Sequence, residues 1–406
     1  MRRLYMDDAA TTSVNSRVLK AMMPFFTEEY GNPSSQHEIG ELARRAIDSA
    51  RQALAKEINA KPWEIYFTSG ATESNNWVFQ GLTRVKENIT QDFNLSPLLL
   101  KSREYSKRQN RGDINVSCYK YKNKIIISEV EHASVLEPCS FLEKNGYNLI
   151  KIQVDKNGFV NLTQLENEID KNVLVVSVMH VNNVIGTIQD IEAIGMLCKK
   201  KGVLFHTDAS QSFGKLLIDV RAMNVDLLSA GAHKLGGPKG VGLLYIRDGI
   251  DIEPLIYGGG QERGMRGGTE NVAGVVGFAM AFDEMKKVNQ NKIRVLREYI
   301  IQEIEKIGGV INGSRSARLY NNVHASFKGV DGGTLVEFLS QKGIYVSTGS
   351  ACDSRKEKED YVLRAIGLSK EAMNSSIRIT LPSGVTKEEC NAVLRALEKG
   401  IRVLRR

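Results

Sequence analysis

The sequence of 406 residues is poor in cysteine and has no long apolar run. Its five cysteines are scattered without the paired spacing of a zinc site or a disulfide framework, although one could be a free reactive thiol. The longest apolar runs, such as residues 173–178, suit a buried strand rather than a membrane span, and the N-terminus has no run of signal-peptide length. These absences predict a cytoplasmic protein without a membrane span or a structural metal.

Charge of one sign dominates only one part of the chain. The formal net charge is +8, and residues 101–124 contain eight basic residues against two acidic ones. This segment therefore supplies most of the charge, and the remainder is nearly neutral, so a nucleic-acid-binding surface along the whole chain is not expected. The content of 42% apolar and 25% charged residues is ordinary for a globular protein, and the length suffices for two domains.

Apolar runs typical of buried strands alternate with amphipathic segments typical of helices. The expected strands cover residues 65–68, 125–128, 149–154, 173–178, 203–206 and 241–246, and the expected helices include 38–55, 162–169 and 191–200. This alternation predicts an α/β fold with a mostly parallel, doubly wound sheet. Ligands of such sheets bind beyond the carboxyl ends of the strands, and the polar motifs of this chain fall at those ends.

A glycine-rich run at residues 258–269 differs in composition from the preceding sequence and marks the expected domain boundary. From about residue 291 onward the pattern mixes helical and strand segments, which is typical of an α+β domain. We therefore expect a large domain at residues 15–268 and a smaller α+β domain built from residues 1–14 and 269–406.

His233 and Lys234 lie in a Gly- and Pro-rich bend between two apolar runs. This layout holds a lysine rigidly at a strand end. In a partly desolvated site beside other cations the pKa of a lysine falls, and its free amine can form a Schiff base. The alternative is an ordinary solvated loop lysine.

Two further motifs bear on function. Residues 65–76 indicate a strand, a glycine turn and a helix start, which can direct backbone amides at an anion, or else form an ordinary connection capped by Ser69 or Thr72. Cys352 lies in a loop of small and polar residues, where a solvent-reachable thiolate is expected, although free cysteines are more often buried and inert.

A Schiff-base lysine, an aspartate two residues beyond a strand-end histidine, and a phosphate-type helix N-terminus are the parts of a pyridoxal phosphate site. Together with the motifs at residues 4–12 and 375–378, they make the chain resemble the NifS/IscS-type cysteine desulfurases. These are fold-type-I, pyridoxal phosphate-dependent enzymes of the class V aminotransferase family. The resemblance covers nearly the whole chain and implies a homodimer that acts on L-cysteine.

The resemblance also implies roles for individual residues. Lys234 would bind the cofactor aldehyde and later remove the α-proton of the substrate, and Asp208 would pair with the pyridine nitrogen. His132 would stack on the ring, and Cys352 would accept sulfur as a persulfide. The remaining roles fall to Ala71, Thr72, His233 and, from the other subunit, Thr269 at the phosphate, to Gln211 and Asn183 at the phenolic oxygen, and to Arg378 with Asn183 at the substrate carboxylate.

Two features depart from the family pattern. Gly231 occupies the position at which a serine usually donates to the phosphate, so a backbone amide, a water or Ser229 would have to replace that hydroxyl. Residues 86–124 lengthen the connection before His132 and hold the basic cluster. A solvated loop is the first interpretation of this insert, and the alternative is docking to an acidic sulfur-acceptor protein or to RNA.

The sequence leaves rival functions open. A selenocysteine lyase, or a C–S lyase that releases free sulfide, would not depend strictly on Cys352. An inactive scaffold or nucleic-acid-binding protein would retain the fold alone, and the presence of Lys234, Asp208, His132 and Cys352 argues against it. For a desulfurase, iron–sulfur cluster assembly, tRNA thiolation and cofactor biosynthesis would all begin with the same persulfide.

Overall fold

The computed structural model describes residues 3–90, 122–348 and 361–405. Cys118, Cys352 and most of the basic insert predicted at residues 86–124 lie outside the described residues. No helix in these described ranges is both long and apolar enough to cross a membrane.

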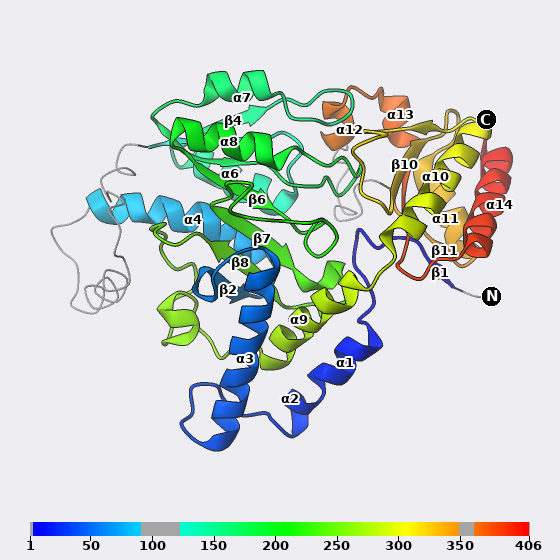
Figure 1. Cartoon of the computed structure of the whole chain (residues 1–406). Helices are drawn as coiled ribbons and strands as arrows, with labels where there is room; N and C mark the ends of the chain where they lie inside the picture. Colours follow the sequence, from blue (N-terminus) through cyan, green and yellow to red (C-terminus); the bar gives the residue numbers. More distant parts are fainter. Residues whose placement is uncertain (1–2, 91–121, 349–360, 406) are drawn as a thin grey trace.

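A seven-stranded sheet forms the centre of the molecule (Figure 1). The strand order is β2-β8-β7-β6-β5-β3-β4, and β8 runs antiparallel to its neighbours β2 and β7 while the other adjacent pairs are parallel. The mostly parallel sheet predicted from the sequence is thus confirmed. The strands are β2 (Ile65–Thr68), β3 (Lys124–Ser128), β4 (Asn148–Ile152), β5 (Val173–Ser177), β6 (Leu204–Asp208), β7 (Leu227–Gly231) and β8 (Gly242–Ile246).

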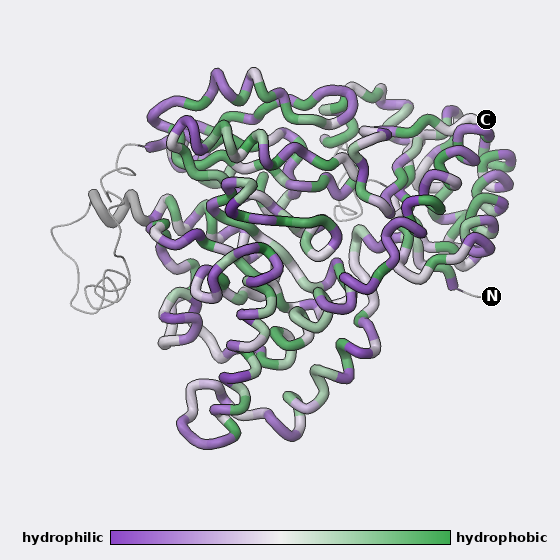
Figure 2. The backbone as a smooth tube through the Cα atoms, viewed as in Figure 1, coloured by the Kyte–Doolittle hydropathy of each residue, from purple (hydrophilic) through white to green (hydrophobic). Residues whose placement is uncertain are grey.

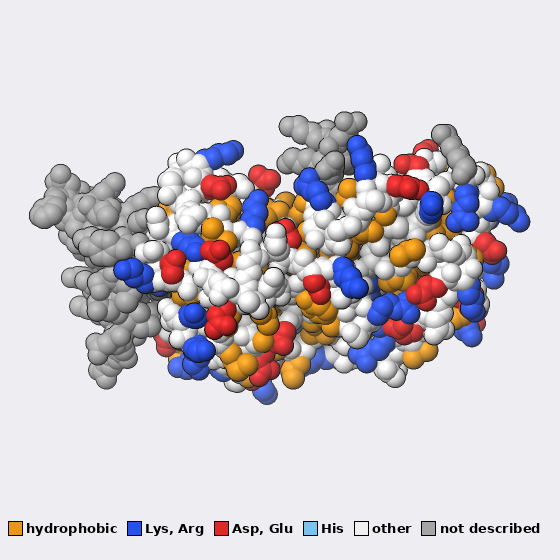
Figure 3. All heavy atoms as spheres, turned by 90° about the horizontal axis from the view of Figure 1, so that it is seen from above, with side chains coloured by type: hydrophobic (Ala, Val, Ile, Leu, Met, Phe, Trp, Pro, Cys, Tyr) orange, Lys and Arg blue, Asp and Glu red, His pale blue; other side chains and the backbone are white. Residues whose placement is uncertain are grey.

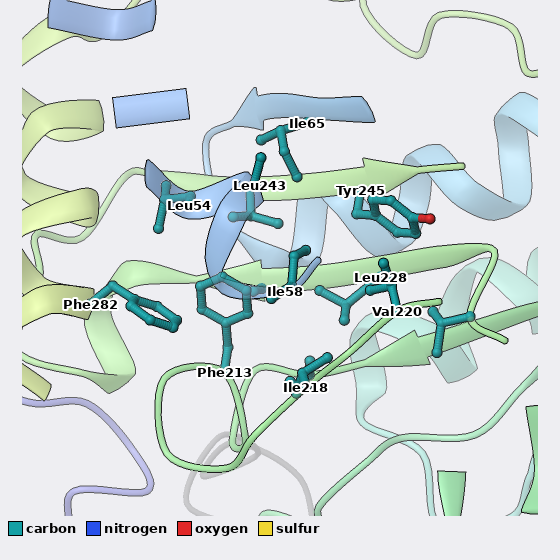
Figure 4. Packing of buried hydrophobic residues seen from close by; sticks show 14 of the residues in the cluster. Leu54, Ile58, Ile65, Phe213, Ile218, Val220, Leu228, Leu243, Tyr245 and Phe282 are labelled. Carbon is teal, nitrogen blue, oxygen red and sulfur yellow. The ribbon is translucent and has the colours of Figure 1, made fainter. Parts of the chain in front are cut away.

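Helices cover both faces of this sheet, because successive strand side chains point to opposite faces. In β3, Ile126 packs into one apolar cluster, whereas Ile125 and Ile127 pack into another. Figure 4 shows part of the first cluster, in which Leu54 and Ile58 lie near Leu243 and Phe213. The helices that accompany this sheet are α1 (Ser16–Met22), α2 (Pro24–Thr27), α3 (Glu38–Glu57), α4 (Ala71–Thr90), α6 (Ala133–Lys144), α7 (Leu162–Glu168), α8 (Ile191–Lys201) and α9 (Val272–Lys286).

The second part of the molecule has its own apolar cluster, around Ile300, Phe327 and Leu397. It contains a three-stranded sheet of order β12-β10-β9 and a parallel pair of β1 with β11. Its strands are β1 (Leu4–Tyr5), β9 (Val310–Ile311), β10 (Asn322–Ser326), β11 (Ile344–Tyr345) and β12 (Ser376–Thr380), and its helices are α10 (Gln290–Lys306), α11 (Gly332–Gln341), α12 (Tyr361–Ala365), α13 (Lys370–Asn374) and α14 (Lys387–Leu404). The chain thus returns its N-terminal strand to the C-terminal part.

The division into two domains stays a proposal. Met6 packs in the second cluster, which supports placing the N-terminal residues with the C-terminal part. Helix α9 packs against α1 and α3 in the first cluster, so we propose that the large domain extends to Lys286 rather than ending at residue 268.

The surface is polar and mixed in charge. Figure 2 shows apolar residues along the central strands and polar residues along the outer turns of many helices. On the face in Figure 3, side chains of both signs are interspersed among apolar ones rather than gathered into one field. The described residues on this face therefore show no concentration of one charge like that in the sequence of residues 101–124.

Candidate active site

The carboxyl ends of parallel strands carry most of the predicted site residues. Asp208 ends β6, and Gly231 ends the neighbouring strand β7, two residues before His233 and three before Lys234. These two strands are paired in register, with Asp208 opposite Ser229. Because parallel strands end at the same edge of the sheet, the fold brings these side chains to one place.

The Lys234 ammonium is held by backbone carbonyls from the start of the chain. Its Nζ donates to the carbonyl oxygens of Ala9 at 2.6 Å and Ala10 at 2.7 Å. The Gln211 side-chain amide donates to the same Ala9 oxygen at 3.0 Å. We call residues 7–12, which cross the site in this way, the N-terminal strap. The motif at residues 4–12 carries part of the family resemblance, but the sequence predicts no role for these residues.

Both parts of the molecule hold the N-terminal strap. The Thr380 hydroxyl accepts a hydrogen bond from the Ala9 amide at 2.9 Å. The Thr12 hydroxyl donates to the His233 carbonyl at 2.9 Å, and the Thr11 hydroxyl is 3.1 Å from Nδ1 of His233. Contacts to both sides fix the strap, and the strap in turn fixes where the lysine amine can lie.

The Asp208 carboxylate is buried and fully oriented by neighbours. Oδ2 accepts from the Asn75 amide at 2.8 Å, and Oδ1 accepts from the Ser210 amide at 2.8 Å and its hydroxyl at 2.5 Å. Asn75 also donates to the Ser134 hydroxyl, which lies 2.8 Å from Nδ1 of His132. A continuous chain of hydrogen bonds therefore joins His132 to Asp208.

Asn75 and Ser134 contact predicted site residues but were not themselves predicted from the sequence. Asn75 lies on the second turn of α4 and points back at Asp208, and it could have been suspected from its place just after the anion-binding motif. Glu131, which precedes His132, is a further buried group. Burial raises the pKa of its carboxyl to about 8, although the Ser128 hydroxyl and the Met179 amide donate to it.

Arg378 and Asn183 form a polar pair with two unsatisfied atoms. The Arg378 guanidinium is buried and donates to Oδ1 of Asp7 at 2.7 Å and to the Asn183 carbonyl at 2.9 Å. Within the described residues, Nε of Arg378 and Oδ1 of Asn183 are buried without a hydrogen-bond partner. Since buried polar atoms are nearly always paired, these two are fitted to a polar ligand.

The N-terminus of α4 forms a small polar recess with Gly231 and His233. Within the described residues, no hydrogen bond uses the amides of Ala71 or Thr72. A Cβ atom on Gly231 would lie 3.5 Å from the Ala71 nitrogen and 3.6 Å from Cδ2 of His233, so the three residues enclose a small space. Two free helix amides make this space suited to an anion.

His233 lines this recess as a neutral ring. Burial lowers its pKa to about 4, and the neighbouring Lys234 cation acts in the same direction. Thr269, predicted to serve the other subunit, is exposed on the loop before α9, and within the described residues no hydrogen bond joins it to this group. Among the described residues, the structure therefore brings the predicted site residues together except Thr269, and Cys352 lies outside the described residues.

The three described cysteines are unsuited to sulfur chemistry. Cys139, Cys198 and Cys390 are all buried. Burial raises the pKa of each thiol, to about 12 for Cys198 and about 11 for Cys390. Since the thiolate is the reactive form, the described part of the chain contains no activated thiol. In the described ranges no cluster of three or more metal-ligating side chains occurs either.

Comparison with known proteins identifies the family. The family model described as aminotransferase class-V matches residues 4–92 and 113–393. The chain belongs to the aminotransferase class-V family. This membership confirms the predicted fold class and the resemblance stated above.

Among its class-V relatives, the cysteine desulfurase IscS of Dictyoglomus turgidum is 44% identical over 410 residues, covering 100% of this chain and 96% of that protein. The cysteine desulfurase IscS of Methanosarcina thermophila is 39% identical, covering 100% and 93%. A solved NifS-like protein superimposes with a TM-score of 0.85 at 36% identity, covering 99% of this chain and all of that one. The structure of SspA in complex with cysteine gives 0.77 at 35% identity, covering 94% and 99%.

Proposed function

We propose that this protein is a cysteine desulfurase that depends on pyridoxal phosphate and converts L-cysteine to L-alanine. The observation that carries the proposal is the position of Lys234, whose amine is held just beyond the end of β7 by the Ala9 and Ala10 carbonyls, beside Gln211. The full-length similarity to cysteine desulfurases supports the same conclusion.

The residues present fit the cofactor. The free amides of Ala71 and Thr72, with the neutral ring of His233, would hold the phosphate. Asp208, oriented by Asn75, would hold a proton on the pyridine nitrogen. When bound, the cofactor supplies an electron sink for the bond electrons of the substrate α-carbon.

The chain's own groups account for binding and proton transfer. Arg378 would bind the substrate carboxylate as a planar fork, and Asn183 would supply its unpaired amide oxygen to the polar part of the ligand. Lys234, as a free amine, would take the α-proton, and the carbonyls of Ala9 and Ala10 would stabilise the ammonium that results.

Sulfur transfer requires a thiolate from outside the described residues, and we assign it to Cys352. Its thiolate would attack the substrate sulfur, so that one S–S bond forms, the substrate C–S bond breaks, and the carbon takes a proton to leave as alanine. The persulfide on Cys352 would then pass to an acceptor protein. The acceptor, the homodimer with Thr269 at its partner's phosphate, and the cytoplasmic location remain predictions.

The test is turnover of L-cysteine by the purified protein with a reductant, with alanine and sulfide quantified separately. We expect equal amounts of the two products, and we expect both Lys234→Ala and Cys352→Ser to abolish them. Turnover by Cys352→Ser would instead identify a C–S lyase or a selenocysteine lyase. An unmodified protein that binds the cofactor but leaves cysteine unchanged would favour the inactive scaffold.

A further inference from the structure

The segment at residues 261–268 crosses the edge of the sheet in a strained conformation. Glu262 and Arg263 are consecutive non-glycine residues with φ of 46° and 60°. Side chains disfavour this left-handed region, so the conformation persists only where the surroundings impose it. We call residues 261–268 the strained arm.

Buried contacts impose that conformation. The Glu262 carboxylate receives a bidentate pair from Arg51 at 2.7 and 2.8 Å and accepts the Phe67 amide at 3.0 Å. The side chains of this ion pair are only 8% and 3% exposed. Arg263 donates to the Ile65 carbonyl at 2.8 Å and lies 4.2 Å from the ring centre of Tyr66. The strained arm is therefore fixed to strand β2, which leads directly into α4.

Towards the C-terminal end of the strained arm, Arg266 contacts the first turn of α4. Nε and Nη2 of Arg266 donate to the two carboxylate oxygens of Glu73 at 2.9 and 3.0 Å. The same carboxylate accepts the Ser69 amide at 2.8 Å. Burial raises the pKa of Glu73, but the hydrogen bonds from Arg266 and Ser69 bring it below its ordinary value, so the group is ionised.

An ionised Glu73 places a negative charge beside the anion recess. Glu73 is one residue after Thr72 and two residues after Ala71, and the free amides of these two residues form that recess. A carboxylate in the first turn stabilises a helix but repels a second anion at the same helix end. A bidentate arginine removes this repulsion, because it neutralises the carboxylate and holds it turned toward the Ser69 amide.

We propose that Arg266 is a positioning residue for the cofactor phosphate, acting through Glu73. This inference rests on the proposed cofactor of the active site. The strained arm fixes Arg266, Arg266 neutralises Glu73, and the amides of Ala71 and Thr72 are left to the phosphate. This role for the arm gives a reason why two left-handed residues are retained within it.

The test is the dissociation constant of pyridoxal phosphate, measured from the absorbance band of the cofactor bound to Lys234. Arg266→Ala should weaken binding about tenfold, because an unpaired carboxylate then faces the phosphate. Glu73→Gln should not weaken it, and the double variant should return close to the unmodified value. Arg266→Lys keeps the charge and should retain most of the affinity. Arg315→Ala, which removes a surface ion pair with Glu305, is the matched control and should change nothing.

Pyridoxal, which lacks the phosphate, distinguishes electrostatic repulsion of the phosphate from a general disturbance of the binding site. The effect of Arg266→Ala should vanish with this probe. An unchanged constant for Arg266→Ala, a double variant as weak as the single one, or an equal loss with pyridoxal would each overturn the inference. If the unmodified protein gives no cofactor band, the proposed function itself fails, and this result is distinct from the other three.

Discussion

Gly231→Ser adds the hydroxyl that the family resemblance leads us to expect at this position, and the structure has room for a Cβ atom there. Gly231 is extended, with φ −136° and ψ 141°, a conformation open to any residue. A Cβ atom there would meet nothing closer than 3.5 Å, so the substitution causes no clash. The new hydroxyl would lie beside the Ala71 amide, where the phosphate is proposed to bind.

The expected gain follows from a single hydrogen bond to a charged acceptor. Such a bond contributes about 1.5–3 kcal/mol, which corresponds to pyridoxal phosphate binding roughly 10- to 100-fold tighter. The assay is the dissociation constant of the cofactor, with Gly231→Ala as the control for the backbone. Gly242→Ser serves as a steric control, because a Cβ atom there would meet the Gly70 backbone at 2.6 Å.

Equal affinities of Gly231→Ser and Gly231→Ala would refute the reasoning. That result would mean that the hydroxyl does not reach the phosphate, and the phosphate would then lie elsewhere than between α4 and Gly231. A gain that persists with pyridoxal, which has no phosphate, would refute it equally, since the added donor has no phosphate to bind there.

Three other outcomes test the structure more widely. Burial lowers the pKa of Lys215 to about 8 from 10.5, so the unfolded chain binds more protons than the folded one between these pH values. The free energy of unfolding should therefore rise from pH 8 to pH 10.5, and it should rise less steeply in Lys215→Met, as measured by urea unfolding. Phe205→Ala empties a fully buried site and should cost about 3–5 kcal/mol, whereas Leu217→Ala, 86% exposed, should cost less than about 0.5 kcal/mol. Arg378→Lys loses the bidentate fork and should raise KM for L-cysteine about tenfold or more in steady-state assays.

Strand positions were predictable because each strand is a short apolar run bounded by polar motifs. In β3, for example, every residue from Lys124 to Ser128 is buried, as a strand covered on both faces requires. The antiparallel direction of β8 was not predictable in the same way. It depends on pairing with β2, whose residues lie about 180 positions earlier, and local periodicity carries no information about such pairing.

The same distinction applies to the site. Lys234, Asp208 and His132 were found because each lies in a recognisable motif at a strand end. Their supports come from distant segments and act through backbone atoms or side-chain hydrogen bonds, as the Ala9 carbonyl does for Lys234 and the Asn75 amide for Asp208. A backbone carbonyl has no residue type to recognise, so only the folded structure could assign it.

The N-terminal strap also has a consequence for the order in which the protein is built. Its contacts join Ala9 to Lys234 across 225 positions and to Thr380 across 371. Contacts of such separation form late, since long loops must close first, and domains fold as their residues emerge during synthesis. The large sheet can therefore assemble on the ribosome while Lys234 is still unrestrained. The contact between Ala9 and Thr380 can form only after residue 380 is made, so the strap that holds Lys234 is completed at a closing step of folding.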